Sequence, residues 1–126
     1  MTAREIYDII KANERNYRYF GIRTCNDEYA IGDECAASYN WDNERDEEDW
    51  ELLDGTCATG FDYLYLYDDP TDDDIADDVA EIEKALKINR AYRGAHTYLI
   101  AGMSSEYGND DAEIIISGAE VVAIIK

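Results

Sequence analysis

The sequence predicts a single α+β domain, residues 1–126, with a mostly antiparallel sheet and two main helices. Three observations predict this fold class. Apolar residues recur at helical spacing in two segments, one near the amino terminus and one after Pro70. Several short segments between turn residues have strand-like composition or alternate at period two. The chain is 46% apolar, which is enough for one core, and its length fits one domain.

The first helix is expected to begin at Thr2, which forms a capping box with Glu5, and to end near Asn13. Its inward side carries isoleucines at helical spacing, at Ile6, Ile9 and Ile10.

The second helix is expected over residues 72–90, with Thr71 and Asp74 at its start and Gly94 as its stop. Apolar residues at spacings of three and four predict its buried stripe, which consists of Ile75, Val79, Ile82 and Leu86. Lysines and arginines near its carboxyl end interact favourably with the helix dipole and so stabilise the helix.

Six strands are expected, at 17–24, 29–31, 61–67, 97–101, 113–117 and 120–125. The last two are expected to be joined by a short hairpin-like connection at Ser117-Gly118-Ala119. Residues 38–55 read as an irregular polar loop that carries Trp41 and Trp50 and packs on the core as a lid.

The charge is concentrated in one block. Sixteen of the thirty acidic residues lie between Asp46 and Glu83, where there is no Lys or Arg, and the formal net charge is −19. Like charges repel before contact, so this field opposes binding to nucleic acid or anionic lipid. A partner is therefore expected to be basic.

Several classes of site find no support in the residues. The chain opens without a signal peptide, has no membrane-spanning run, and its three Cys lack C-x-x-C spacing, so we expect a cytoplasmic protein with neither disulfides nor zinc. The acids around Asp68–Asp74 lack the EF-hand order, so no metal is expected. Nothing near the single His96 suggests a catalytic base, and no Gly-rich phosphate loop precedes a helix.

Glu113 is the acid best placed for chemistry. It heads the expected strand 113–117, directly after a Gly-containing loop, where a carboxylate can bind a sugar hydroxyl or a developing cation. The plainer interpretation is a solvent-facing acid at a strand start.

The order of elements over about residues 17–125 resembles a small ADP-ribosyltransferase-type domain. The matching segments are Tyr19-Phe20-Gly21-Ile22-Arg23-Thr24, Ala30-Ile31-Gly32-Asp33, Gly55-Thr56-Cys57-Ala58-Thr59-Gly60-Phe61, the helix at 72–90, the strand at 97–101 and Glu113. The resemblance implies an NAD-binding cleft, in which Glu113 holds the nicotinamide ribose while the glycosidic bond breaks.

Within that resemblance, Arg23 would take the place of the family's NAD-gripping His or Arg, with Gly21, Thr56 and Thr59 beside the cofactor. Phe20 occupies the position where the family has that His or Arg. This departure equally allows a fold without activity that has been reused for binding.

The rival hypothesis is a non-enzymatic inhibitor that mimics nucleic acid. Carboxylates three and four residues apart on a helix lie about 5–6 Å from each other, a scale comparable with the phosphates of duplex DNA. The expected surface joins the acids of 42–51 to one face of the second helix, formed by Asp74, Asp77, Asp78 and Glu81. In size and acidity the chain is similar to small inhibitors of phages and mobile elements, including many anti-CRISPR proteins. The plainer interpretation is a solvated acidic helix.

Overall fold

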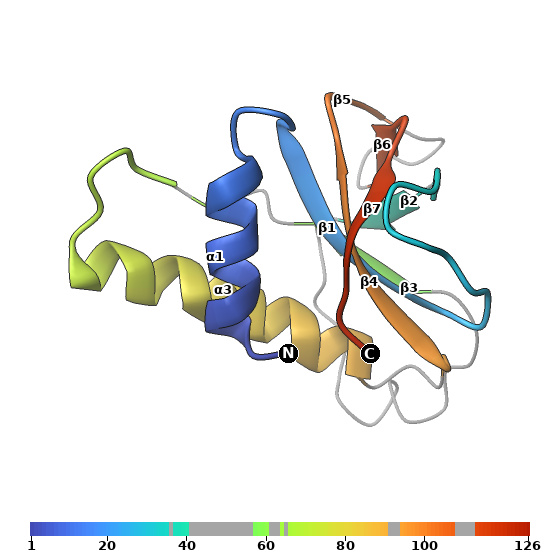
Figure 1. The fold of residues 1–126 in the computed structure, drawn as a ribbon, viewed down its shortest axis with the longest axis horizontal. Helices are drawn as coiled ribbons and strands as arrows, with labels where there is room; N and C mark the ends of the chain where they lie inside the picture. Colours follow the sequence, from blue (N-terminus) through green and yellow to red (C-terminus); the bar gives the residue numbers. More distant parts are fainter. Residues whose placement is uncertain (36, 41–56, 61–63, 65, 91–93, 108–112) are drawn as a thin grey trace.

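The computed structural model describes residues 1–126 except 36, 41–56, 61–63, 65, 91–93 and 108–112 (Figure 1). In the described residues the α+β class is confirmed, with two helices, α1 and α3, and antiparallel strands in two sheets. The four-stranded sheet has the order β3-β1-β4-β7 and consists of Cys57–Gly60, Tyr19–Cys25, His96–Gly102 and Glu120–Ile124. The three-stranded sheet has the order β2-β6-β5 and consists of Ala37–Asn40, Glu113–Ser117 and Ser104–Tyr107.

Helix α1 (Ala3–Asn13) has the predicted capping box and the predicted end. The Glu5 N–H donates to Thr2 Oγ1 (3.2 Å), and the Thr2 N–H donates to Glu5 Oε1 (3.1 Å). Hydrogen bonds from the Thr2 N–H and from the Thr2 side chain favour the ionised form of the Glu5 carboxyl, so they lower its pKa. Local signals alone were sufficient to place this helix.

Helix α3 (Asp72–Arg90) also begins as predicted, with Thr71 and Asp74 exchanging backbone-to-side-chain hydrogen bonds. Ile82 and Leu86 of the predicted stripe are buried, and Ile75 and Val79 are partly buried against the same core. The stripe is confirmed.

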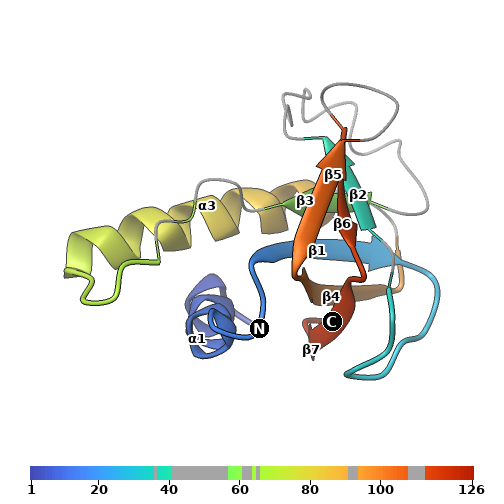
Figure 2. The same ribbon diagram turned by 90° about the horizontal axis from the view of Figure 1, so that it is seen from above.

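The two sheets share one long bent hairpin. β4 runs into β5 with only Met103 between them, and β6 runs into β7 through Gly118 and Ala119. β4 pairs with β7 in one sheet, while β5 pairs with β6 in the other. Gly118 adopts a φ of 63°, a conformation that glycine accepts without strain. Figure 2 shows the three-stranded sheet standing up from the four-stranded one.

Side chains alternate between the two faces of the four-stranded sheet. Phe20, Ile22 and Leu99 point to the face that α1 and α3 cover, and there they form the main core with Ile6, Ile10 and Ile82. The opposite face carries a second cluster, which consists of Cys25, Cys35, Tyr98, Ile100, Ala119 and Val121. The segment from Asn26 to Glu34, called here the strap, runs beside this second cluster.

The predicted strand at 61–67 falls mostly outside the described residues, and at Leu64, Leu66 and Tyr67 the chain is not a strand, since Leu64 and Leu66 pack against the helix core. Two predictions are wrong. Residues 29–31 form no strand, and the backbone bonds from the strap to β7 are made at Gly32 and Asp33 instead. β6 and β7 do not pair with each other, because each pairs with one arm of β4–β5. β2, β3 and β5 were not among the six predicted strands.

Gly94 has a packing role that was not predicted. A Cβ at this position would lie 2.5 Å from Thr24 Cγ2 and 2.9 Å from the Cys25 backbone nitrogen. Only a glycine therefore allows the chain to approach β1 so closely here. Neither helix of the described residues has the length and apolarity needed to cross a membrane.

Candidate functional site

The predicted carboxylate face of α3 needs correction. Asp77 is exposed and Glu81 is half-buried, as a surface face requires. Asp74 is half-buried and accepts a hydrogen bond from the Thr71 N–H (3.0 Å), so it caps the helix. Asp78 is only 2% exposed and accepts from the Leu66 N–H (3.1 Å). A partner cannot reach Asp78 in this structure, so the four acids are not one face.

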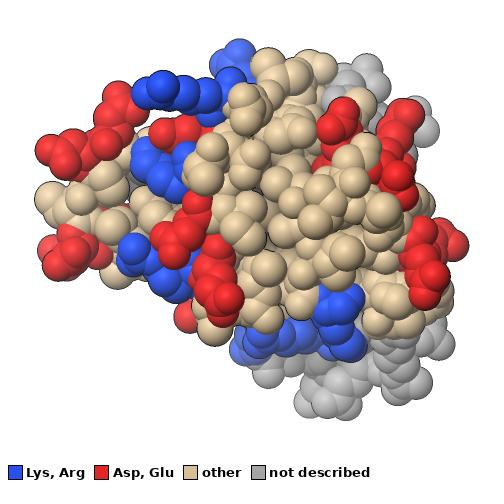
Figure 3. All heavy atoms as spheres, in the orientation of Figure 1, with Lys and Arg blue, Asp and Glu red and all other residues tan. Residues whose placement is uncertain are grey.

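The exposed acids gather elsewhere, at the amino-terminal end of α3 and the loop before it. We call residues 67–77 the acidic projection, and its exposed carboxylates are Asp68, Asp69, Asp72, Asp73 and Asp77. Figures 1 and 2 both show this end of α3 extending past α1, away from the sheets. Figure 3 shows red side chains at this tip. In the described part of the chain, none of the five carboxylates forms an ion pair.

The projection is anchored by a set of contacts that we call the Leu66 clasp: Lys11, Glu14, Asp78 and the backbone of Leu66 and Tyr67. Lys11 Nζ donates to the carbonyl oxygens of Leu66 (3.2 Å) and Tyr67 (2.6 Å) and to both Glu14 carboxylate oxygens (3.0 and 2.9 Å). Asp78 binds the Leu66 N–H from the other side. The two helices thus hold both backbone groups of one residue.

The clasp explains an unusual backbone conformation. Leu66 has a φ of 47°, in the left-handed region, which costs a non-glycine residue about 1–2 kcal/mol. Hydrogen bonds to charged groups contribute about 1.5–3 kcal/mol each. Because charged side chains bind both its N–H and its C=O, the contacts outweigh the strain. The chain therefore enters the projection from a fixed point.

The residues of the transferase hypothesis lie in different sheets. Gly21 and Arg23 are on β1, on the face opposite the helices, and Thr59 is on β3, where it pairs with Ile22. Glu113 is the first residue of β6 and pairs with Asn40 in the other sheet. Thr56, Trp41 and Trp50 lie outside the described residues.

Arg23 and Glu113 lie at different levels along the β4–β5 arm. Arg23 is opposite Tyr98 of β4, whereas Ile114, next to Glu113, is opposite Tyr107 of β5. Tyr98 and Tyr107 are separated by nine residues, about 30 Å of extended chain before the bend at Met103 shortens it. The transferase hypothesis stays a prediction from resemblance.

Arg23 contacts Tyr29, which packs against the second cluster. Its guanidinium carbon lies 5.8 Å from the centre of the Tyr29 ring, a cation–π distance. Burial raises the pKa of the Cys35 thiol and of the Tyr29 phenol, and the charge of Arg23 partly offsets both shifts. These contacts hold the strap against the sheet.

In the part of the chain that the structure describes, no three His, Cys, Asp or Glu side chains are grouped to hold a metal ion. His96 Nε2 lies 3.7 Å from Glu28 Oε1, at the edge of the strap.

Sequence reasoning missed Lys11 and Leu66. Nothing local marks Lys11, because its acceptors Leu66 and Tyr67 are 55 and 56 residues away. The burial of Asp78 had a signal: it stands three residues after Ile75 and four before Ile82, on the apolar side of the helix.

Comparison with known proteins gives no matching family model, no matching curated protein and no matching solved structure.

Proposed function

We propose that the protein is a non-enzymatic binding module whose acidic projection docks on a basic protein surface, of the kind that nucleic-acid-binding proteins present. The observation that carries the proposal is the projection itself: five exposed carboxylates without a described ion pair, at the end of a helix that extends beyond the domain body.

Helix stability explains only some of these acids. Acids in the first turn gain about 0.3–1 kcal/mol each from the helix dipole, which accounts for Asp72 and Asp73. Asp77 lies four residues after Asp73, and such like-charge pairs cost about 0.2–0.5 kcal/mol. Asp68 and Asp69 precede the helix. A basic partner would offset this repulsion, because its positive charges would attract the same carboxylates.

The anchoring supports the same proposal. A docking surface loses less entropy on binding when it is already held in place. The Leu66 clasp fixes the loop at one end of the projection, and the Thr71–Asp74 bonds fix the start of α3. The projection thus offers a preorganised array of charges rather than a flexible acidic tail.

The proposal is tested by measuring binding to an immobilised nucleic-acid-binding domain of high positive charge. Binding should weaken steeply as salt rises, because the screening length falls from about 10 Å at 0.1 M to about 3 Å at 1 M. Added duplex DNA should displace the protein, whereas an uncharged polymer should not. Salt-insensitive binding, or a complex that DNA leaves intact, would count against the proposal.

A further inference from the structure

One ammonium group joins helix α1 to the loop that leads into the acidic projection. Lys11 Nζ has four oxygen atoms within 3.2 Å: the carbonyl oxygens of Leu66 and Tyr67 and both carboxylate oxygens of Glu14. The Lys11 side chain is only 23% exposed. A base in the last turn of α1 also interacts favourably with the helix dipole, but that role requires no bonds to residues 55 and 56 positions away. These two bonds therefore serve the loop.

Asp78 and Lys11 hold the Leu66 backbone in different ways. Asp78 belongs to α3, so its bond with the Leu66 N–H (3.1 Å) ties the loop to the same helix that carries the projection. Lys11 belongs to α1, whose inward side is buried in the main core, so its bonds tie the loop to a second helix. Asp68 and Asp69 follow directly in the chain. Lys11 therefore fixes the start of the projection relative to the domain body.

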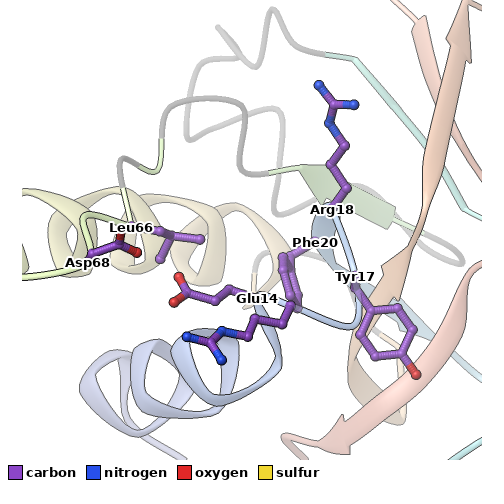
Figure 4. Close-up of a pocket in the computed structure, with 7 residues that line it drawn as sticks. Glu14, Tyr17, Arg18, Phe20, Leu66 and Asp68 are labelled. Atoms are coloured by element: carbon purple, nitrogen blue, oxygen red, sulfur yellow. The ribbon is translucent and has the colours of Figure 1, made fainter.

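The Lys11 charge also compensates the Glu14 carboxylate. Glu14, Leu66 and Asp68 line one cavity of about 330 Å³. Figure 4 shows the Glu14 carboxylate pointing toward Leu66 and Asp68. While Lys11 Nζ lies 2.9 Å away, the Glu14 charge is balanced. Without the ammonium, this carboxylate would face carbonyl oxygens and a second carboxylate, and such repulsion is stronger where the groups are partly buried. Loss of one positive charge would replace attraction between α1 and the loop by repulsion.

We infer that Lys11 is a positioning residue for the acidic projection: its positive charge holds the loop at 66–69 in the place from which the projection docks. This inference rests on the docking function proposed above, and it adds a base to a surface that is otherwise defined by acids. The affinity of a docking surface falls with the fraction of molecules in which that surface has its binding conformation. Removal of the Lys11 charge should therefore weaken docking on a basic partner, although it makes the protein more negative.

Lys11→Met tests the inference, because it keeps an apolar side chain and removes the charge. The control Lys84→Met makes the same change in net charge at an exposed position of α3, outside the projection and the Leu66 clasp. At one fixed salt concentration, Lys11→Met should bind the immobilised basic nucleic-acid-binding domain roughly threefold to tenfold more weakly than the wild type. Lys84→Met should bind like the wild type or slightly more tightly.

A third variant separates positioning from net charge. Lys11→Met/Glu14→Gln has the net charge of the wild type and lacks the uncompensated carboxylate. It should therefore bind more tightly than Lys11→Met, but more weakly than the wild type. Net charge alone predicts that Lys11→Met binds most tightly of these three proteins, because it is the most negative. The two explanations thus give Lys11→Met opposite ranks.

Amide hydrogen exchange of the unbound proteins reports on the loop without any partner. In Lys11→Met the Leu66 amide should exchange about tenfold faster than in the wild type, because the loop opens locally. The amides of β4 should exchange at unchanged rates, because β4 is paired on both sides and does not contact the clasp through any described hydrogen bond. A general loss of stability would instead accelerate exchange at both places.

The results distinguish this inference from the proposed function. If the wild type does not bind the basic domain, the docking function is wrong, and the role of Lys11 in docking is wrong with it. If the wild type binds and Lys11→Met binds as tightly as Lys84→Met, the inference alone is overturned. Faster exchange throughout β4 in Lys11→Met would also overturn it. Weaker binding together with faster exchange confined to the loop supports it.

Discussion

Removal of the phenolic hydroxyl should have opposite effects on the free energy of unfolding at two tyrosines that are equally buried. Tyr7 and Tyr98 are each 2% exposed. The Tyr98 hydroxyl donates to the Asp27 carbonyl (2.9 Å) and accepts from the Tyr29 N–H (2.9 Å). The Tyr7 hydroxyl has no hydrogen-bond partner among the described residues. Replacing either by Phe removes one oxygen and keeps the ring.

The magnitudes follow from those bonds. Each hydrogen bond contributes about 0.5–1.5 kcal/mol net, so Tyr98→Phe should lower the free energy of unfolding by about 1–3 kcal/mol. A buried hydroxyl without a partner keeps its desolvation cost, so Tyr7→Phe should leave the free energy unchanged or raise it by about 1 kcal/mol. In a domain of this size, 1 kcal/mol corresponds to roughly 3–5 °C in Tm.

Urea unfolding of the wild type and both variants measures this difference, and an unchanged slope shows that the unfolded states are comparable. A Tyr7→Phe protein that loses as much stability as Tyr98→Phe would be inconsistent with an unbonded Tyr7 hydroxyl. It would mean that the Tyr7 hydroxyl is satisfied in solution.

Three further predictions concern packing, pH and the transferase resemblance. Gly94→Ala should lower the free energy of unfolding by about 1–3 kcal/mol, because its Cβ meets β1, whereas Gly32→Ala, with open space around it and a φ of 92°, should cost about 1 kcal/mol in the same urea assay. Burial raises the pKa of Tyr7, Tyr17 and Tyr29, and for Tyr17 the hydrogen bond to Glu120 adds to the shift. The folded state thus holds these phenolic protons more tightly, so stability should be unaffected below about pH 10 and fall as the pH rises through the raised pKa values, less steeply in Tyr17→Phe. Millimolar NAD should leave the Tm of both wild type and Glu113→Gln unchanged, and NAD stabilisation of the wild type alone would favour the transferase hypothesis instead.

The parts of the fold that were predictable depend on neighbours in sequence. The capping boxes at Thr2 and Thr71 and the apolar stripe of α3 are local patterns, and the structure confirms them. Leu64 and Leu66 of the predicted strand 61–67 are partly buried against the helix core and not in a sheet. Alternation of apolar residues in a sequence indicates that alternate side chains are buried, but it does not indicate which element they pack against.

The parts that were not predictable depend on distant partners. The pairing of β6 and β7 with different strands is decided by the bends at Met103 and Gly118, which place the two arms of the hairpin in different sheets. The position of Asp78 on the apolar side of α3 was visible in the sequence, but its hydrogen-bond donor, the Leu66 N–H, was not. Composition located the acidic block, but only these contacts show which acids stay exposed.

If the projection docks on a basic surface, the position of its acids, and not the total charge of the protein, determines binding. Asp69→Asn/Asp73→Asn/Asp77→Asn removes three of the five exposed negative charges of the projection. Asp27→Asn/Glu28→Gln/Glu34→Gln removes three exposed negative charges of the strap, with the same change in net charge. Exposed ion pairs contribute about 0.2–1 kcal/mol each, so the projection variant should bind the basic domain roughly threefold to a hundredfold more weakly, while the strap variant should bind like wild type. Equal losses in both variants, or a loss confined to the strap variant, would contradict the claim.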